Sequence, residues 1–242
     1  MKILIVNDDG IEAQGLLHLA RWARKHGEVT VCAPKYEQSG KSHAINFIEP
    51  FEIKRVDLAG GIEAYSVDST PADCTRFGII GLNRQYDIVL SGINWGVNMS
   101  ADIVYSGTVG AIFEAEHLSH KAIALSIAKE TPLPPEPVLD SIFDYVQSNK
   151  LLDYSNLYNV NIPTAPRGIK ITRQGDAYFK DEFFKLDGDF YMQRGHAIPE
   201  TNKDDETYDT IAFEHGFVSV TPMTLERTNT EAFNKLVKEK TQ

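Results

Sequence analysis

The chain has 242 residues, 42% of them hydrophobic and 24% charged, and carries a formal net charge of −10 at pH 7. This composition is typical of a globular protein with a sizeable core, and the negative charge argues against binding to nucleic-acid duplexes or anionic membranes. No stretch reaches the roughly 18 apolar residues of a membrane span, and the opening MKILIV is too short for a secretory signal, so we expect a soluble, cytoplasmic protein.

The first half of the chain alternates predicted strands with predicted helices. Residues 2–7 predict a buried strand, 13–27 a helix with a basic last turn, and 28–34 a second strand. A strand–helix–strand unit of this length is typical of a parallel sheet with a right-handed crossover. Thr70 is expected to cap a helix, because Pro71 follows it. The further elements expected here are strands 51–56, 62–67, 87–94 and 121–128 and helices 68–82 and 108–118.

The second half opens with four prolines in residues 129–137, which predict a linker. Asp187-Gly188 predicts a hairpin turn, and residues 196–210 a polar loop. The alternation of strands and helices makes the class α/β. We expect one domain over residues 1–242, with a core at about 1–128 and an extension at about 137–242. The remaining expected elements are helices 138–150 and 230–241 and strands 156–163, 168–174 and 216–223.

The two cysteines are expected to be buried free thiols. Cys32 and Cys74 both lie in apolar stretches, which favours burial over a disulfide or a catalytic thiol. The cysteines and histidines show no spacing typical of a zinc site. A reducing compartment fits this pattern.

Polar residues follow several of the predicted strands. In a parallel α/β sheet, ligands bind outside the carboxyl ends of the strands. We therefore expect four groups of residues to converge on one crevice. These groups are Asp8-Asp9, Ser39-Gly40, the segment SGINWGVN at 91–98, and Ser106-Gly107-Thr108.

The adjacent carboxylates Asp8 and Asp9 have two interpretations. They could form a turn in which one carboxylate caps the following helix. They could instead hold a divalent cation, which would remove the repulsion between two neighbouring negative charges. Hard cations such as Mg²⁺ prefer oxygen ligands, and the hydroxyl of Ser39 and the amide of Asn94 could complete such a site.

The other groups also have structural alternatives. Ser39-Gly40 could be a flexible turn, and His43 nearby could attract an anion or be solvated. Asn94 and Asn98 could be ordinary turn residues, since asparagine tolerates left-handed backbone. We expect Trp95 to pack beneath its loop in preference to stacking on a base.

The segment Ser106 to Thr108 opens a predicted helix. Its backbone N–H groups, together with the helix dipole, could bind an anion. The alternative is a simple serine or threonine cap at the start of the helix. The segment matches neither the P-loop pattern nor G-x-G-x-x-G, so a nucleoside triphosphate or dinucleotide site is weakly supported.

Taken together, these segments resemble the SurE family of 5′/3′-nucleotidases, the survival-protein E acid phosphatases. The matching elements occur in the family's order with similar spacing and cover most of the chain. They are NDDG, the SG after the second strand, STPADC, SGIN-G-N, YSGTVGA-EA and GFVSVTP. Trp95 departs from the family, which often has a small residue there, and residues 176–210 do not align clearly.

The resemblance implies a Rossmann-like, mostly parallel sheet flanked by helices, with a C-terminal β-hairpin and helix extension. It implies a phosphomonoesterase that acts on nucleoside 5′- or 3′-monophosphates with one divalent metal ion per subunit, Mg²⁺ or Mn²⁺. It also implies a homodimer or homotetramer with exchanged C-terminal segments.

The resemblance assigns roles to nine residues of this chain. The metal ligands would be Asp8, Asp9, Ser39 and Asn94. Apart from the resemblance, we expect the catalytic residues to be Asp8 and Asp9, either of which could act as base or nucleophile instead of only as a ligand. The positions around the substrate phosphate would be Gly40, Asn98, Ser106, Gly107 and Thr108.

Three other functions are alternatives to this one. A non-catalytic sensor of mononucleotides or metals could use the same fold, and phosphate release that EDTA abolishes separates the enzyme from the sensor. An NAD-dependent oxidoreductase is disfavoured because G-x-G-x-x-G is absent after the first strand. A glycosyltransferase would usually carry D-x-D where this chain has two adjacent aspartates.

Overall fold

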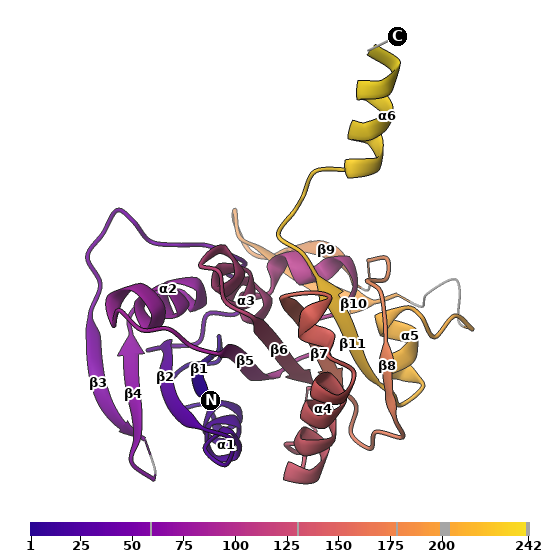
Figure 1. The fold of residues 1–242 in the computed structure, drawn as a ribbon. Coiled ribbons are helices and arrows are strands. Elements are labelled where there is room, and N and C mark those ends of the chain that lie inside the picture. Colours follow the sequence, from indigo (N-terminus) through magenta and orange to yellow (C-terminus); the bar gives the residue numbers. More distant parts are fainter. Residues whose placement is uncertain (59, 130, 178, 199–203, 241–242) are drawn as a thin grey trace.

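The computed structural model describes residues 1–58, 60–129, 131–177, 179–198 and 204–240. They form one nine-stranded sheet with helices on both faces, and a separate two-stranded hairpin (Figure 1). Across the sheet the strands run in the order β3 (Ile53–Leu58), β4 (Ile62–Val67), β2 (Glu28–Pro34), β1 (Lys2–Val6), β5 (Ile88–Trp95), β6 (Ala122–Ile127), β7 (Leu157–Ile162), β11 (Val218–Met223) and β8 (Ile169–Ile171).

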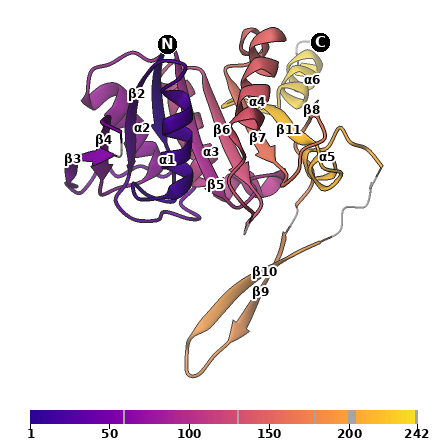
Figure 2. The same cartoon turned by 90° about the horizontal axis from the view of Figure 1, so that it is seen from below.

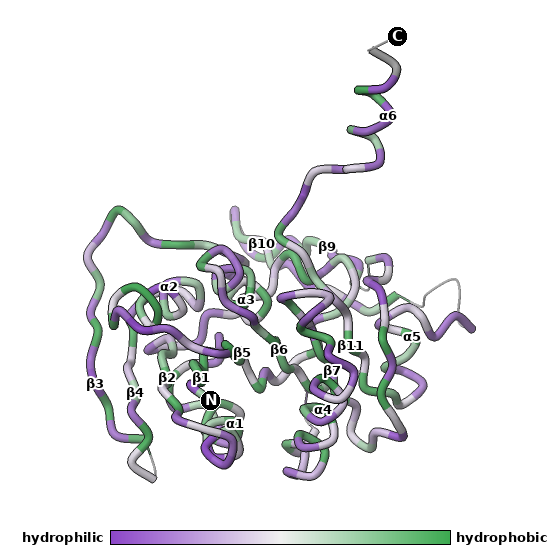
Figure 3. Tube along the Cα trace, viewed as in Figure 1, coloured by the Kyte–Doolittle hydropathy of each residue, from purple (hydrophilic) through white to green (hydrophobic). Residues whose placement is uncertain are grey.

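Four helices cover the two faces of this sheet. Helices α1 (Gln14–Ala23) and α4 (Glu136–Ser148) pack on one face, and α2 (Pro71–Arg76) and α3 (Gly107–His117) pack on the other (Figures 1 and 2). Strand β1 serves both cores, because successive side chains point to opposite faces of a sheet. Ile3 and Ile5 join the core beneath α1, whereas Leu4 and Val6 join the core beneath α3. The hydrophobic colouring of β6 in Figure 3 agrees with its complete burial.

The order in which successive strands are added to the sheet reverses at β1: β2 lies on one side of it, and β5 and β6 lie on the other. Strand β1 pairs in parallel with β2 on one side and with β5 on the other, and β5 and β6 are also parallel. Among the described strands of this nine-stranded sheet, the antiparallel pairs are β3 with β4 and β11 with β7. Such a switch point leaves a crevice outside the carboxyl ends of the strands, where ligands bind in this class of fold.

The remaining elements are short or lie at the edge of the molecule. Strands β9 (Phe179–Lys185) and β10 (Tyr191–Ala197) form a hairpin that projects from the body in Figure 2. Helix α6 (Thr230–Lys240) stands away from the sheet in Figure 1. The short helical segments are η1 (Phe77–Gly81), η2 (Ser100–Tyr105), η3 (Leu151–Asp153) and α5 (Asp209–Glu214).

Several predictions from the sequence are confirmed. The class is α/β with a mostly parallel sheet, and the Asp187-Gly188 turn joins two antiparallel strands. Oγ1 of Thr70 caps α2 by accepting a hydrogen bond from the N–H of Asp73 at 3.1 Å. Cys32 and Cys74 are buried free thiols.

Other predicted elements have different bounds. The helix expected over 13–27 ends at Ala23. The residues after it lead into β2, which begins beside β1 where the N–H of Glu28 donates to the carbonyl oxygen of Met1. The helix expected over 68–82 consists of α2 followed by η1, a π-helical turn. The strand expected over 87–94 is β5, which runs from Ile88 to Trp95.

The C-terminal half contributes to the main sheet as well as to the extension. Strand β7 pairs in parallel with β6, and β11 and β8 continue the sheet beyond it. The loop expected over 196–210 contains the end of β10 and the start of α5, whose Thr210 and Ile211 are buried, while residues 199–203 lie outside the described residues. The division of the domain near 128–137 stays a prediction. No helix in the described part of the chain is long and apolar enough to cross a membrane.

Candidate active site

The four groups of residues meet at the carboxyl ends of β1 and β5. They surround a pocket of about 330 Å³. Six of the nine residues assigned from the sequence line it: Asp8, Ser39, Gly40, Asn94, Asn98 and Ser106. The other three lie next to residues that line the pocket: Asp9 accepts from the N–H of Trp95, and Gly107 and Thr108 lie against Asp8.

The turn after β1 is held by its own polar atoms. Nδ2 of Asn7 donates to the carbonyl oxygen of Gly10 at 2.9 Å, and the N–H of Gly10 donates to Oδ1 of Asn7 at 3.3 Å. Helix α1 starts at Gln14, and its capping residue, Ala13, provides no side-chain hydrogen bond. The carboxylates of the turn therefore do not cap α1, which removes the structural alternative for them.

Asp8 is buried, and α3 holds it in place. Its side chain is only 5% exposed, and the hydroxyl of Thr108 donates to its Oδ1 at 2.5 Å. Burial raises the pKa of Asp8, whereas the hydroxyl and N–H of Thr108 act to lower it. A Cβ atom on Gly107 would lie 3.0 Å from the side chain of Asp8, so glycine at this position permits the close approach of α3.

Asp9 is partly exposed, and its negative charge, like that of Asp8, is unfavourable when no cation is bound. Burial, followed by the charge of Asp8, raises the pKa of Asp9 from 3.8 to about 6. The N–H of Trp95 lies 3.4 Å from Oδ2 of Asp9, at the long end of hydrogen-bond distances. The two carboxylates thus carry a repulsion that a bound cation would relieve.

An irregularity in β5 brings Asn94 to the pocket. The pairing of β5 with β6 shifts register between Ser91 and Asn94, and such a bulge redirects the side chains that follow it. Gly92 has a φ of +137°, and a Cβ atom there would lie 2.3 Å from the carbonyl oxygen of Leu125. Nδ2 of Asn94 donates to the carbonyl oxygen of Gly96 at 2.6 Å, which leaves Oδ1 as the atom able to act as a metal ligand.

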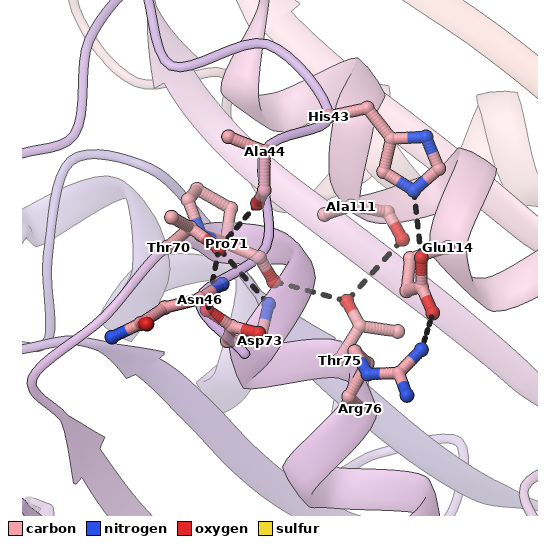
Figure 4. Close-up of polar contacts among 10 residues, drawn as sticks. All are labelled: His43, Ala44, Asn46, Thr70, Pro71, Asp73, Thr75, Arg76, Ala111 and Glu114. Atoms are coloured by element: carbon pink, nitrogen blue, oxygen red, sulfur yellow. Dashed lines mark hydrogen bonds and ion pairs between the residues drawn. The ribbon is translucent and has the colours of Figure 1, made fainter. Parts of the chain in front are cut away.

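The loop that carries Ser39 and Gly40 is held by α2 (Figure 4). The hydroxyl of Thr70 donates to the carbonyl oxygen of Ala44 at 2.6 Å. The carboxylate of Asp73 accepts from the N–H of Asn46 at 2.9 Å. These bonds fix the end of the loop against the first turn of α2.

A second set of contacts ties the same loop to α3. Nε2 of His43 donates to Oε2 of Glu114 at 2.7 Å, and Nη1 of Arg76 donates to Oε1 of the same carboxylate at 2.7 Å (Figure 4). Burial acts to raise the pKa of Glu114, but the bonds from His43 and Arg76 outweigh it and lower that pKa. His43 therefore holds the loop in place; it does not line the pocket around Asp8, where an anion-attracting role would require it.

The segment around Asn98 is clamped by residues that the sequence analysis did not identify. Oδ1 of Asn161 accepts from the N–H of Asn98 at 2.8 Å, and the Nδ2 atoms of Asn159 and Asn161 donate to the carbonyl oxygen of Asn98. Nδ2 of Asn98 donates in turn to Oγ of Ser126 at 2.8 Å. The sequence does carry a signal for this clamp. Two asparagines stand at alternate positions of the strand NLYNVNIP, and a buried amide requires a hydrogen-bond partner.

Ser106 caps α3 at the edge of the pocket. Its Oγ accepts a hydrogen bond from the N–H of Val109 at 3.0 Å, so the cap expected from the sequence is present. The cap and an anion site are compatible, because the first N–H groups of a helix remain available to a ligand. The positive end of the dipole of α3 thus lies beside Asp8.

Trp95 corrects one prediction. It was expected to pack beneath its loop, yet its side chain is 41% exposed and lines the pocket. Trp95 is the last residue of β5, and it is the one exposed residue of that strand, whose other residues are buried.

The charge of the pocket indicates what it needs from a ligand. Asp8, Asp102 and Asp181 line it, and the described lining residues include no Lys, Arg or His. The described residues also include no group of three His, Cys, Asp or Glu side chains that could hold a metal. The available set instead combines two carboxylates with a hydroxyl and an amide oxygen, which are donors that suit a hard cation such as Mg²⁺ or Mn²⁺.

Comparison with known proteins agrees with this architecture. A 5′-nucleotidase SurE from Thermosipho melanesiensis is 37% identical over 248 residues, which cover 98% of this chain and 96% of the relative. A 5′-nucleotidase SurE from Thermoanaerobacter sp. is 36% identical over 246 residues, with coverage of 98% and 97%. The crystal structure of the SurE protein from Aquifex aeolicus superposes with a TM-score of 0.80 at 33% identity, covering 99% of this chain and 100% of that one. Because the family model for survival protein SurE also matches residues 3–181, this chain belongs to the SurE family.

Proposed function

We propose that this chain is a metal-dependent phosphomonoesterase that hydrolyses nucleoside 5′-monophosphates, with 3′-monophosphates as further candidates, to nucleoside and phosphate. The relatives named 5′-nucleotidase SurE support the reaction class. The observation that carries the proposal is the carboxylate pair Asp8-Asp9, partly buried beside the N-terminus of α3 in a pocket with no cationic side chain among its described lining residues. An anionic substrate requires positive charge there, and a metal ion with the helix dipole would provide it.

We propose one Mg²⁺ or Mn²⁺ ion per subunit. Its ligands would be Asp8, Asp9, Ser39 and Asn94. Once bound, such an ion polarises a phosphate oxygen and lowers the pKa of a water molecule. The raised pKa values of the two aspartates support this ligand set, because a cation stabilises the ionised form of both.

Other residues of the site would position Asp8 and bind the phosphate. Thr108 keeps Asp8 in one orientation by donating to its Oδ1. The N–H groups of Gly107 and Gly40 would donate to phosphate oxygens. Ser106 and Asn98 would shape the rest of the phosphate site, and Thr108 would border it. Donors fixed in advance stabilise the charge that develops in the transition state without reorganising.

Asp9 is our candidate for the group that accepts a proton from the attacking water. It is less buried than Asp8, and the hydroxyl of Thr108 donates to Asp8 and not to Asp9.

Phosphate release tests the proposal directly. A panel of nucleoside 5′- and 3′-monophosphates is incubated with the purified chain and Mn²⁺ or Mg²⁺, and free phosphate is measured. We expect release that stops with EDTA and returns with excess metal. Binding of the nucleotide without any release would favour the non-catalytic sensor, and release that EDTA does not affect would refute the metal site.

We further propose that the chain assembles into a homodimer or homotetramer through its C-terminal region. Apolar side chains are exposed on β9, β10 and α6: Phe183, Phe184, Tyr191, Met192, Phe233, Leu236 and Val237. Exposed apolar patches of this kind mark interaction sites. Light scattering should give at least twice the 27.0 kDa of one chain, and a mass equal to one chain would refute assembly. The buried free thiols of Cys32 and Cys74 support a cytoplasmic location.

A further inference from the structure

The side chain of Trp95 occupies an unusual place for a tryptophan. It is 41% exposed and lines the same pocket as Asp8, Ser39 and Asn94. By contrast, Trp22 is 3% exposed, and its Nε1 donates to Asp140 at 2.7 Å. A large exposed aromatic ring is unfavourable in water, so its position beside the reactive groups calls for a ligand that covers it.

The backbone on both sides of Trp95 is fixed. The residue ends β5, and it pairs with Ile127 in the sheet. The N–H of Gly96 donates to the carbonyl oxygen of Ile127 at 3.0 Å, and the N–H of Trp95 lies 3.4 Å from Asp9. The indole therefore starts from a rigid strand next to two of the proposed metal ligands, and a rigid platform binds a ligand with little loss of entropy.

Two further aromatic side chains line this pocket. Tyr105 comes from η2 and is 61% exposed, and Phe179 comes from the start of β9 and is 42% exposed. The N–H of Phe179 donates to Oδ2 of Asp102 at 3.0 Å, which anchors the base of the hairpin to η2. Three exposed rings and the proposed metal site share one pocket, and together they match a ligand with an anionic end and a flat, apolar end.

We propose that Trp95 is the stacking platform for the nucleobase of the substrate, with the aromatic side chains of η2 and β9 completing the base site. This inference rests on the proposed phosphomonoesterase function and adds the residue that recognises the nucleoside. Base–aromatic stacking is tolerant of base identity because every base has a π-face. The platform therefore favours nucleotides over phosphate esters without a base, and it accepts purines and pyrimidines.

Paired substrates test this role. AMP and ribose 5-phosphate share the phosphate and the sugar, but only AMP has a base to stack. Replacing Trp95 by Ala should lower the ratio of kcat/KM for AMP to kcat/KM for ribose 5-phosphate by about 5- to 150-fold. Trp95→Phe keeps an aromatic ring and should restore most of that ratio. A ratio unchanged in Trp95→Ala would overturn the proposal.

Fluorescence gives a second readout that does not need turnover. The chain has two tryptophans, and the buried Trp22 is shielded from a ligand in the pocket. Adding AMP should quench the emission of Trp95, and the quenching should disappear in Trp95→Phe; ribose 5-phosphate should not cause it. Quenching without phosphate release would support the base platform while refuting the phosphomonoesterase function. Phosphate release from AMP without quenching would refute the platform alone.

Discussion

Replacing Asp9 by Asn should stabilise the chain when no metal is present. Burial and the charge of Asp8 raise the pKa of Asp9 to about 6, so between pH 4 and 6 the folded state binds more protons than the unfolded state, and stability falls as the pH rises through this window. This rise in the pKa of Asp9 corresponds to about 3 kcal/mol. Because Asp9 is partly exposed, solvent screening reduces this to roughly 1 to 2 kcal/mol.

Thermal unfolding in EDTA and in excess Mn²⁺ measures this effect. At pH 7.5 in EDTA, Asp9→Asn should raise the Tm by about 2 to 8 °C, and the gain should disappear near pH 4, where the wild-type carboxyl is protonated. Excess Mn²⁺ should stabilise the wild type much more than the variant, since the variant has lost a ligand. Asp144→Asn, at an exposed position of α4, is the control and should change neither value. A variant that is less stable than the wild type in EDTA, or equally stabilised by Mn²⁺, would refute the reasoning.

Three further substitutions test the supports of the site. Thr108→Val removes the hydroxyl that donates to Asp8 and should lower kcat/KM for AMP about tenfold, at a stability cost of about 1 kcal/mol; wild-type phosphate release would contradict this. Asn161→Leu leaves the N–H of Asn98 without its acceptor and should lower the free energy of unfolding in urea by about 1 to 3 kcal/mol, so an unchanged midpoint would count against the clamp. Glu114→Gln weakens two charge-assisted bonds and should speed hydrogen exchange of residues 39–46, whereas unchanged exchange would show that the loop does not depend on them.

The sequence predicted those features that depend on local patterns. The alternation of strands and helices produced the parallel sheet, and the Thr70-Pro71 pair located the start of α2. The rule that ligands bind at the carboxyl ends of parallel strands was enough to bring Asp8 and Asn94 together. Each of these features follows from residues that are neighbours in sequence or from a general property of the fold.

The sequence did not predict the features that depend on contacts between distant residues. The clamp on Asn98 requires Asn159 and Asn161, more than sixty residues away, and their pattern alone does not name a partner. Similarly, Trp95 is exposed at the end of a strand whose pairing with β6 shifts register, and its neighbours in sequence indicate neither feature. The short helix α5 lies against β11 and β7 and buries Ile211, and these long-range contacts are not evident from its local sequence.

The central claim is that Asp8, Asp9, Ser39 and Asn94 bind one divalent cation on which phosphate release depends. The most direct measurement titrates the EDTA-stripped chain with Mn²⁺ and follows bound metal and phosphate release from AMP in the same samples. Both should rise together and reach a plateau at one equivalent of Mn²⁺ per chain, and both should be lost in Asp8→Asn. Phosphate release before any Mn²⁺ is added, or Mn²⁺ binding that Asp8→Asn leaves intact, would contradict the claim.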